Sequence, residues 1–190
     1  MTSKLYQCGS TNIINTFKTI QYNSTRYYTV GFNVLESKNL QFRDQFGKSH
    51  NAQSIFSGKK VVLFGIPNTT PVDDFIHIPS YVKNAEKIYK KGVDLIVCLT
   101  NSDVPVLRAK SISLDPKRLI AMLSDTESKF AMENQLASEK SEKGLGTEEP
   151  LVLTKRYAMI IDNGKITYEN IERDENDTDH TNGESILKHL

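Results

Sequence analysis

The chain has 190 residues, of which 38% are hydrophobic, and carries 24 Lys and Arg against 23 Asp and Glu. This is the size of one domain with an extension, since domains most often have about 100–150 residues. The balanced charge supplies no positive field to hold a polyanion, so we expect no nucleic-acid partner. The longest apolar runs, 61–66 and 95–99, are much shorter than the roughly 18 residues that span a bilayer, so we expect no membrane segment.

The two cysteines, Cys8 and Cys98, are too few for a secreted disulfide framework, which favours a reducing, cytoplasmic location. Residues 1–35 contain many Ser and Thr and no acidic residue, a composition compatible with a mitochondrial transit peptide. The C-terminal tripeptide KHL is similar to a peroxisomal signal, so that organelle is a further alternative. We expect residues 1–24 to form an N-terminal extension, mobile or targeting, and residues 25–190 to form one domain.

The middle of the chain alternates short apolar runs with a helical pattern. Lys60 to Ile66 and Val93 to Thr100 are nearly continuous apolar runs, typical of strands buried on both faces of a parallel sheet. Between them a helix is predicted from Asp73 until Gly92 ends it, with Pro79 expected to kink it. Its apolar positions at helical spacing are Phe75, Ile78, Val82, Ala85 and Tyr89. The order strand, helix, strand implies a right-handed crossover between parallel neighbours.

Two polar segments interrupt the second half of the chain. Ala137 to Pro150 and Arg173 to Glu184 are charged and rich in turn-forming residues, which indicates surface loops. Before them we expect, in order, a short helix ending near Ser111, a strand from Leu119 to Leu123, and a helix capped by Asp125 or Thr126 that ends at Leu136.

The clearest local signal is the dipeptide Asn-Gly at 163–164. Both residues tolerate the positive φ of a tight turn, so the flanking segments 157–162 and 165–169 are predicted to form a β-hairpin. A terminal helix that begins at Gly183 or Glu184 and runs to Leu190 follows.

A parallel βαβ unit followed by an antiparallel hairpin and a helix predicts a thioredoxin-like α/β fold. In this fold helices flank a central mixed sheet. The N-terminal region adds length before that unit, so we expect extra N-terminal strands such as Arg26 to Leu35. We expect the functional site at the loop after the first strand of the βαβ unit, because the free N–H groups at the start of a helix bind anions.

That loop and the start of its helix, residues 65–81, read GIPNTTPVDDFIHIPSY. The segment resembles the peroxiredoxins, specifically the peroxiredoxin-5-like subfamily that includes the yeast alkyl hydroperoxide reductases. Their signature is a Pro, a short loop, Thr or Ser before Pro, one residue, the peroxidatic Cys, and four residues later His-x-Pro-Gly-aromatic. The residues that match it are Pro67, Thr70, Pro71, His77, Pro79 and Tyr81. The resemblance covers about residues 55–190 and implies a redoxin domain.

The peroxidatic position of the signature holds Asp73, or Asp74 if residues are counted forward from the first proline, so the cysteine is absent in either register. A carboxylate cannot accept a peroxide oxygen as a thiolate does when it becomes sulfenic acid. The resemblance implies that Thr70 and Arg156 match the groups that hydrogen-bond the peroxide, so Thr70, Pro71 and Arg156 form a retained shell around Asp73.

Asp73 has two interpretations. It is either a helix N-cap that Arg156 holds as a structural ion pair, with bidentate contact available, or a permanent imitation of the negatively charged thiolate. His77 could act as a general base or metal ligand, but no cluster with ligand spacing surrounds it, and the resemblance implies a structural role. We therefore expect no metal and no organic cofactor.

Two classes of function follow. The first is a peroxiredoxin-like protein that has lost its peroxidatic cysteine and acts as a non-catalytic binding or regulatory module. The resemblance implies a homodimer, or a heterodimer with an active paralogue, and thioredoxin is a further candidate partner. The alternative is a thiol-dependent peroxidase, linked to thioredoxin or glutathione, that uses Cys8 or Cys98. Cys98 lies mid-strand, where an inert buried thiol is expected, and Cys8 lies in a segment expected to be mobile.

Overall fold

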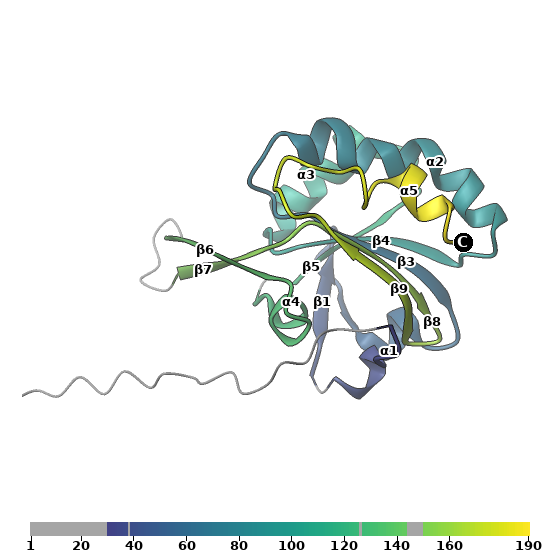
Figure 1. Cartoon of the computed structure of the whole chain (residues 1–190). Helices are drawn as coiled ribbons and strands as arrows, with labels where there is room; N and C mark the ends of the chain where they lie inside the picture. Colours follow the sequence, from purple (N-terminus) through teal and green to yellow (C-terminus); the bar gives the residue numbers. More distant parts are fainter. Residues whose placement is uncertain (1–29, 38, 126, 144–149) are drawn as a thin grey trace, which may run out of the picture.

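The computed structural model describes residues 30–37, 39–125, 127–143 and 150–190. Their strands are β1 Gln41–Asp44, β2 Ser49–Asn51, β3 Lys60–Gly65, β4 Leu95–Thr100, β5 Ala121–Ser124, β6 Ala137–Lys143, β7 Pro150–Thr154, β8 Tyr157–Asp162 and β9 Lys165–Ile171. Seven of these described strands form one mixed sheet in the order β2-β1-β5-β4-β3-β8-β9, and β6 and β7 form a separate ribbon (Figure 1).

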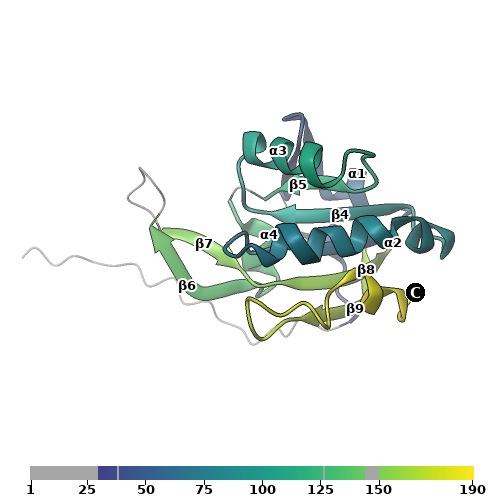
Figure 2. The same ribbon diagram turned by 90° about the horizontal axis from the view of Figure 1, so that it is seen from above.

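Helices cover both faces of the sheet. They are α1 Ala52–Phe56, α2 Ile78–Lys90, α3 Val104–Leu114, α4 Lys129–Glu133 and α5 Gly183–Leu187, with a 3₁₀ turn at Val34–Glu36 and a π-helical turn at Asp73–His77. Helices α2, α3 and α5 lie on one face, whereas α1 and α4 lie on the other (Figures 1 and 2). Of the helices in the described ranges, none combines the length and apolar character needed to span a bilayer.

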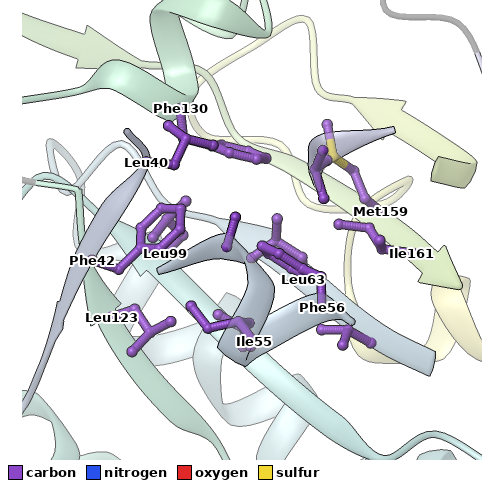
Figure 3. Packing of buried hydrophobic residues seen from close by; sticks show 14 of the residues in the cluster. Leu40, Phe42, Ile55, Phe56, Leu63, Leu99, Leu123, Phe130, Met159 and Ile161 are labelled. Atoms are coloured by element: carbon purple, nitrogen blue, oxygen red, sulfur yellow. The ribbon is translucent and has the colours of Figure 1, made fainter. Parts of the chain in front are cut away.

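Two hydrophobic cores lie on the two faces of the sheet, and β3 contributes to both because its side chains alternate between the faces. Val61 and Leu63 join the cluster under α1 and α4, where the rings of Phe42, Phe56 and Phe130 gather (Figure 3). The neighbouring side chains of β3 point to the opposite face and pack beneath α2. The strand pairs in parallel with β4, as the two apolar runs predicted, and β4 in turn pairs in parallel with β5.

The hairpin and the overall arrangement are confirmed. Strands β8 and β9 pair antiparallel around Asn163 and Gly164, whose φ angles of 45° and 82° are the positive values that the turn requires. The unit formed by β3, α2 and β4, with its two strands parallel, lies beside this hairpin, and α5 packs on α2. This is the predicted thioredoxin-like α/β fold. The predicted terminal helix is shorter than expected, because α5 ends at Leu187.

In the described part of the strand predicted over Arg26 to Leu35, Asn33 forms an isolated antiparallel bridge with Lys165 of β9. Residues 26–29 lie outside the described residues, and the chain then turns into the 3₁₀ segment Val34–Glu36, because the side chain of Asn33 accepts the N–H of Leu35 at 3.0 Å. Strands β1 and β2 supply the additional strands at the sheet edge instead. The expected extension 1–24 also lies outside the described residues.

The helix predicted from Asp73 begins as a π-helical turn, and α2 itself starts at Ile78. Pro79 falls in the first turn of α2, where its missing N–H costs no hydrogen bond, so it interrupts no α-helical ladder. The extra residue of a π turn rotates the preceding side chains out of register. As a result Phe75, predicted on the apolar face, is 79% exposed, whereas Tyr81 is fully buried.

Two other predicted boundaries are wrong. The segment predicted as a loop at Ala137 to Pro150 contains β6 and the start of β7, and an antiparallel ribbon of this kind satisfies backbone groups without needing an apolar face. The helix expected to end at Leu136 is only α4, Lys129–Glu133. Ser128 and not Asp125 is its N-cap residue, although the carboxylate of Asp125 accepts the N–H groups of Lys129 at 3.0 Å and Ala131 at 3.3 Å.

Candidate functional site

The candidate site lies where β3 ends and the π-helical turn begins. Pro67 is buried directly after the strand, and Asn68 takes a φ of 60°, so the loop reverses quickly. The backbone N–H of Asn68 donates to Oδ2 of Asp73 at 2.8 Å, and the carbonyl of Pro71 accepts the N–H of Phe75 at 3.0 Å. These bonds fold the loop back onto the carboxylate of Asp73.

The sheet topology brings Arg156 to this loop. Tyr157, the first residue of β8, pairs with Gly65, the last residue of β3, so Arg156 lies just beyond the end of β3. Its Nη1 contacts Oδ1 of Asp73, and both side chains are 0% exposed. The second oxygen of Asp73 is taken by the Asn68 N–H, so the contact is a single-oxygen ion pair and not the bidentate pair that the sequence allowed.

Asp73 is not the helix N-cap. Val72 occupies that position, and no side chain caps the turn. Burial raises the pKa of the Asp73 carboxyl, and the charge and hydrogen bond of Arg156 together with the N–H of Asn68 oppose that rise. The capping interpretation is therefore wrong, while the ion pair with Arg156 is present.

Arg156 also contacts three further residues of the site. Its Nη2 donates to the carbonyl of Glu175 at 2.6 Å and to Oγ1 of Thr70 at 3.4 Å, and its Nη1 lies 3.4 Å from Nδ1 of His77. The structure thus brings Asp73, Thr70 and His77 together around one guanidinium. Pro71 contributes its backbone carbonyl and lies exposed at the surface.

His77 is fully buried beneath the same helix start. Its Nε2 lies 3.0 Å from the carbonyl of Thr181, which requires Nε2 to carry the proton and leaves Nδ1 as an acceptor toward Arg156. Burial, with a further contribution from the charge of Arg156, lowers the pKa of His77 to about 3, so the imidazole is neutral at physiological pH. The hydroxyl of Tyr81 donates to the same Thr181 carbonyl at 2.5 Å. These contacts give His77 a structural role in anchoring the C-terminal segment.

Cys98 is not part of this cluster. Cys98 lies on β4 opposite Phe64 and is 1% exposed, and burial raises the pKa of its thiol well above the ordinary value. The burial of this thiol, predicted from the sequence, is therefore confirmed. Cys8 lies outside the described residues. In the described ranges, no group of three or more His, Cys, Asp or Glu side chains is placed to hold a metal ion.

Several partners of the site were not predicted from the sequence. Asp74 points away from Arg156 and forms an ion pair with Lys110 of α3. Glu175 and Thr181 come from the segment predicted as a surface loop, yet Thr181 is fully buried. Hydrophobic periodicity carries no signal for such contacts, because they are made by backbone carbonyls of an irregular segment that folds back onto α2.

The fold and the buried guanidinium beside a helix start define a thioredoxin-like protein of the redoxin class. A family model described as Redoxin matches residues 34–187. Peroxiredoxin-2D of Arabidopsis thaliana is 30% identical over 85% of this chain and 98% of its own length. Mitochondrial Peroxiredoxin-2F of Oryza sativa is 32% identical over 73% of this chain and 68% of its own length.

A solved structure gives the same result. Reduced Prx3 from Vibrio vulnificus is 32% identical, covers 85% of this chain and 97% of its own, and superposes with a TM-score of 0.71. The chain belongs to the peroxiredoxin family.

Proposed function

We propose that this chain is a peroxiredoxin-like protein of the peroxiredoxin-5-like subfamily in which Asp73 stands at the peroxidatic position. Without that cysteine, it acts as a non-catalytic binding or regulatory module. The observation that carries this proposal is the fully buried ion pair of Asp73 with Arg156. A permanent carboxylate at this position forms the ion pair that the guanidinium would otherwise form with a thiolate. This ion pair holds the helix start folded.

Peroxide reduction needs a thiolate, which attacks one peroxide oxygen, becomes sulfenic acid and releases water or an alcohol. Asp73 has no such oxidation chemistry. The alternative function, a thiol-dependent peroxidase, has to use Cys8 or Cys98. The burial and raised pKa of Cys98 oppose its use, which leaves Cys8 for that alternative to rest on.

Consumption of hydrogen peroxide and an alkyl hydroperoxide, with thioredoxin and glutathione reducing systems, tests the proposal. We expect the native protein to be inert, Asp73→Cys to gain turnover, and the matched Asp74→Cys variant to gain none, because Asp74 faces Lys110 and not Arg156. Turnover by the native protein would overturn the non-catalytic role, and its loss in Cys8→Ser would then assign it to Cys8. Turnover gained only by Asp74→Cys would overturn the assignment of Asp73.

We propose further that the partner is a second copy of this chain or an active paralogue. The π-helical turn and α3 present the large apolar side chains of Phe75, Ile76 and Ile112, which are 79%, 52% and 65% exposed. The ion pair between Asp74 and Lys110 joins these two elements. Neighbouring exposed apolar side chains such as Phe75 and Ile76 are typical of protein interfaces. Sedimentation of the purified chain tests the homodimer, and co-purification from a cell extract tests the heterodimer. A monomer with no paralogue recovered would overturn both.

A further inference from the structure

Residues 172–182 form the irregular yellow segment between β9 and α5 (Figure 2). One side chain ties the two ends of this segment together. Oε1 of Glu172 accepts the N–H of His180 at 2.7 Å and the hydroxyl of Thr181 at 3.0 Å. The segment is therefore a closed loop of the Ω type, a class of surface loop that is frequently functional.

This loop covers the guanidinium of Arg156, whose side chain is 0% exposed. The backbone carbonyl of Glu175 accepts from Nη2 at 2.6 Å, whereas Oγ1 of Thr70 lies 3.4 Å from the same atom. Asp73 contacts Nη1. The loop thus supplies the shorter of these two bonds to Nη2, and its carbonyl occupies the place that an oxygen atom of a ligand would take.

Polar contacts hold the loop closed, because residues 172–182, which read ERDENDTDHTN, include no hydrophobic residue. The loop is exposed from Arg173 to Asn176. Its turn there is made internally, since the carboxylate of Asp174 accepts the N–H of Asn176 at 2.8 Å. Segments with few buried apolar contacts open at a lower free energy than the core. We therefore expect this loop to open while the sheet and α2 stay folded.

A cavity of about 530 Å³ borders the loop on one side. Its lining combines residues 173–175 of the loop with Pro67 and Thr69 after β3 and with Leu153 and Thr154 of β7. Protein interiors are otherwise close-packed. The loop is therefore not tightly packed against β7 here, and its movement does not require a core to be rearranged.

We propose that residues 172–182 are a lid over Arg156, that the lid is closed in this structure, and that Glu172 holds it closed. In the closed position the carbonyl of Glu175 keeps Nη2 of Arg156 from any ligand. In the open position Nη2 is free to donate to an oxygen atom of a bound molecule. The inference goes beyond the proposed function, since it concerns access to Arg156 whether or not the chain is catalytic.

Hydrogen exchange of the full chain at pH 7, followed by NMR, tests the lid through two protons. One is the N–H of Asn182, which donates to the carbonyl of Thr178 at 2.9 Å. The other is the Nε–H of Arg156, which is buried and has no hydrogen-bond partner in the described residues. We expect both to exchange about 100-fold or more faster than the amides of β3, with one common free energy of opening that low urea concentrations do not change.

Three results would overturn the lid. If both protons exchange at the rate of the β3 amides and with the same dependence on urea, the loop opens only when the whole protein unfolds. If Asn182 exchanges by local opening and Arg156 does not, the loop does not control access to the guanidinium. If the Nε–H of Arg156 exchanges without protection, the guanidinium is not shielded at all.

Two variants test the role of Glu172. Glu172→Gln replaces the charged acceptor with a neutral one, and Thr181→Val removes a donor to it. Each should speed exchange at Asn182 and Arg156 by about tenfold or more, because hydrogen bonds to a charged group are the stronger ones. Unchanged exchange in both variants would refute the role of Glu172.

The matched controls are Glu169→Gln and Thr167→Val, the same two substitutions on β9 and outside the loop. They should leave the exchange of the two lid protons unchanged, and acceleration equal to that of the loop variants would refute a specific role for the loop contacts. Neither proton reports on peroxide consumption, so failure of the lid and failure of the non-catalytic role are separate results.

Discussion

Asp73→Asn removes one charge from the buried ion pair while keeping nearly the same side-chain shape. Both members of the pair are 0% exposed, so neither water nor salt screens the charge that remains on Arg156. Removing one partner of such a pair costs about 3–5 kcal/mol. The Glu175 carbonyl at 2.6 Å and the Thr70 hydroxyl at 3.4 Å still accept from the guanidinium, so we expect a loss near the lower end, about 3 kcal/mol.

Asp74→Asn is the matched control, one residue along the same turn. The side chain of Asp74 is 37% exposed, and partly exposed pairs such as the one that it forms with Lys110 contribute about 0–1 kcal/mol. The double variant Asp73→Asn with Arg156→Met should recover part of the loss, because it leaves no unpaired buried charge.

Urea unfolding at pH 7, followed by circular dichroism and extrapolated linearly to water, measures the free energies of unfolding of the native protein and the three variants. The m values should agree among the variants, so that differences in midpoint report stability alone. If Asp73→Asn and Asp74→Asn lose the same free energy within about 0.5 kcal/mol, the buried pair does not hold the helix start, and the reasoning fails.

Three further outcomes are expected. Gly65→Ala should destabilise the fold by about 3 kcal/mol or more in the same unfolding assay, because the new Cβ would lie 2.0 Å from the ring of Tyr157; an unchanged midpoint would contradict this contact. Burial raises the pKa of Glu169 from its usual 4.5 to about 7, so the folded state holds this proton more tightly than the unfolded state, and the group lowers stability as pH rises through that window. The free energy of unfolding of Glu169→Gln should therefore rise relative to that of the native protein as the pH goes from 4 to 8. A difference between the two proteins that does not change with pH would mean that the carboxyl is hydrated in the folded state. Phe75→Ser, at a side chain 79% exposed, should change the free energy of unfolding by less than about 0.5 kcal/mol but shift sedimentation toward monomer; a dimer of unchanged strength would remove the π-helical turn from the interface.

Some of the site could be predicted from local sequence alone. The short-range patterns are the prolines and threonines of the loop, the spacing of His77 and the Asn-Gly turn. In the structure the first lie in a loop, His77 is buried and Asn-Gly forms a tight turn. Phe75 was predicted wrongly because helical spacing assumes 3.6 residues per turn, and the π-helical turn at Asp73–His77 breaks that spacing. The strand predicted over Arg26 to Leu35 is reduced, in its described part, to one bridge at Asn33, since the side chain of Asn33 bonds the local backbone and diverts it into a 3₁₀ turn.

The sequence by itself determined the order of buried strands, the helix after β3, the hairpin, and the absence of cysteine from the loop, because each depends on residues close together in the chain. Only the tertiary structure decided which charge Asp73 meets, since Arg156 reaches it through the pairing of β8 with β3 across 83 residues of sequence. The same is true of the contacts that Glu175 makes with Arg156 and Thr181 makes with His77. Periodicity encodes which face of an element is buried, whereas the packing of irregular segments such as the one after β9 depends on side-chain and backbone contacts that exist only once the sheet has formed.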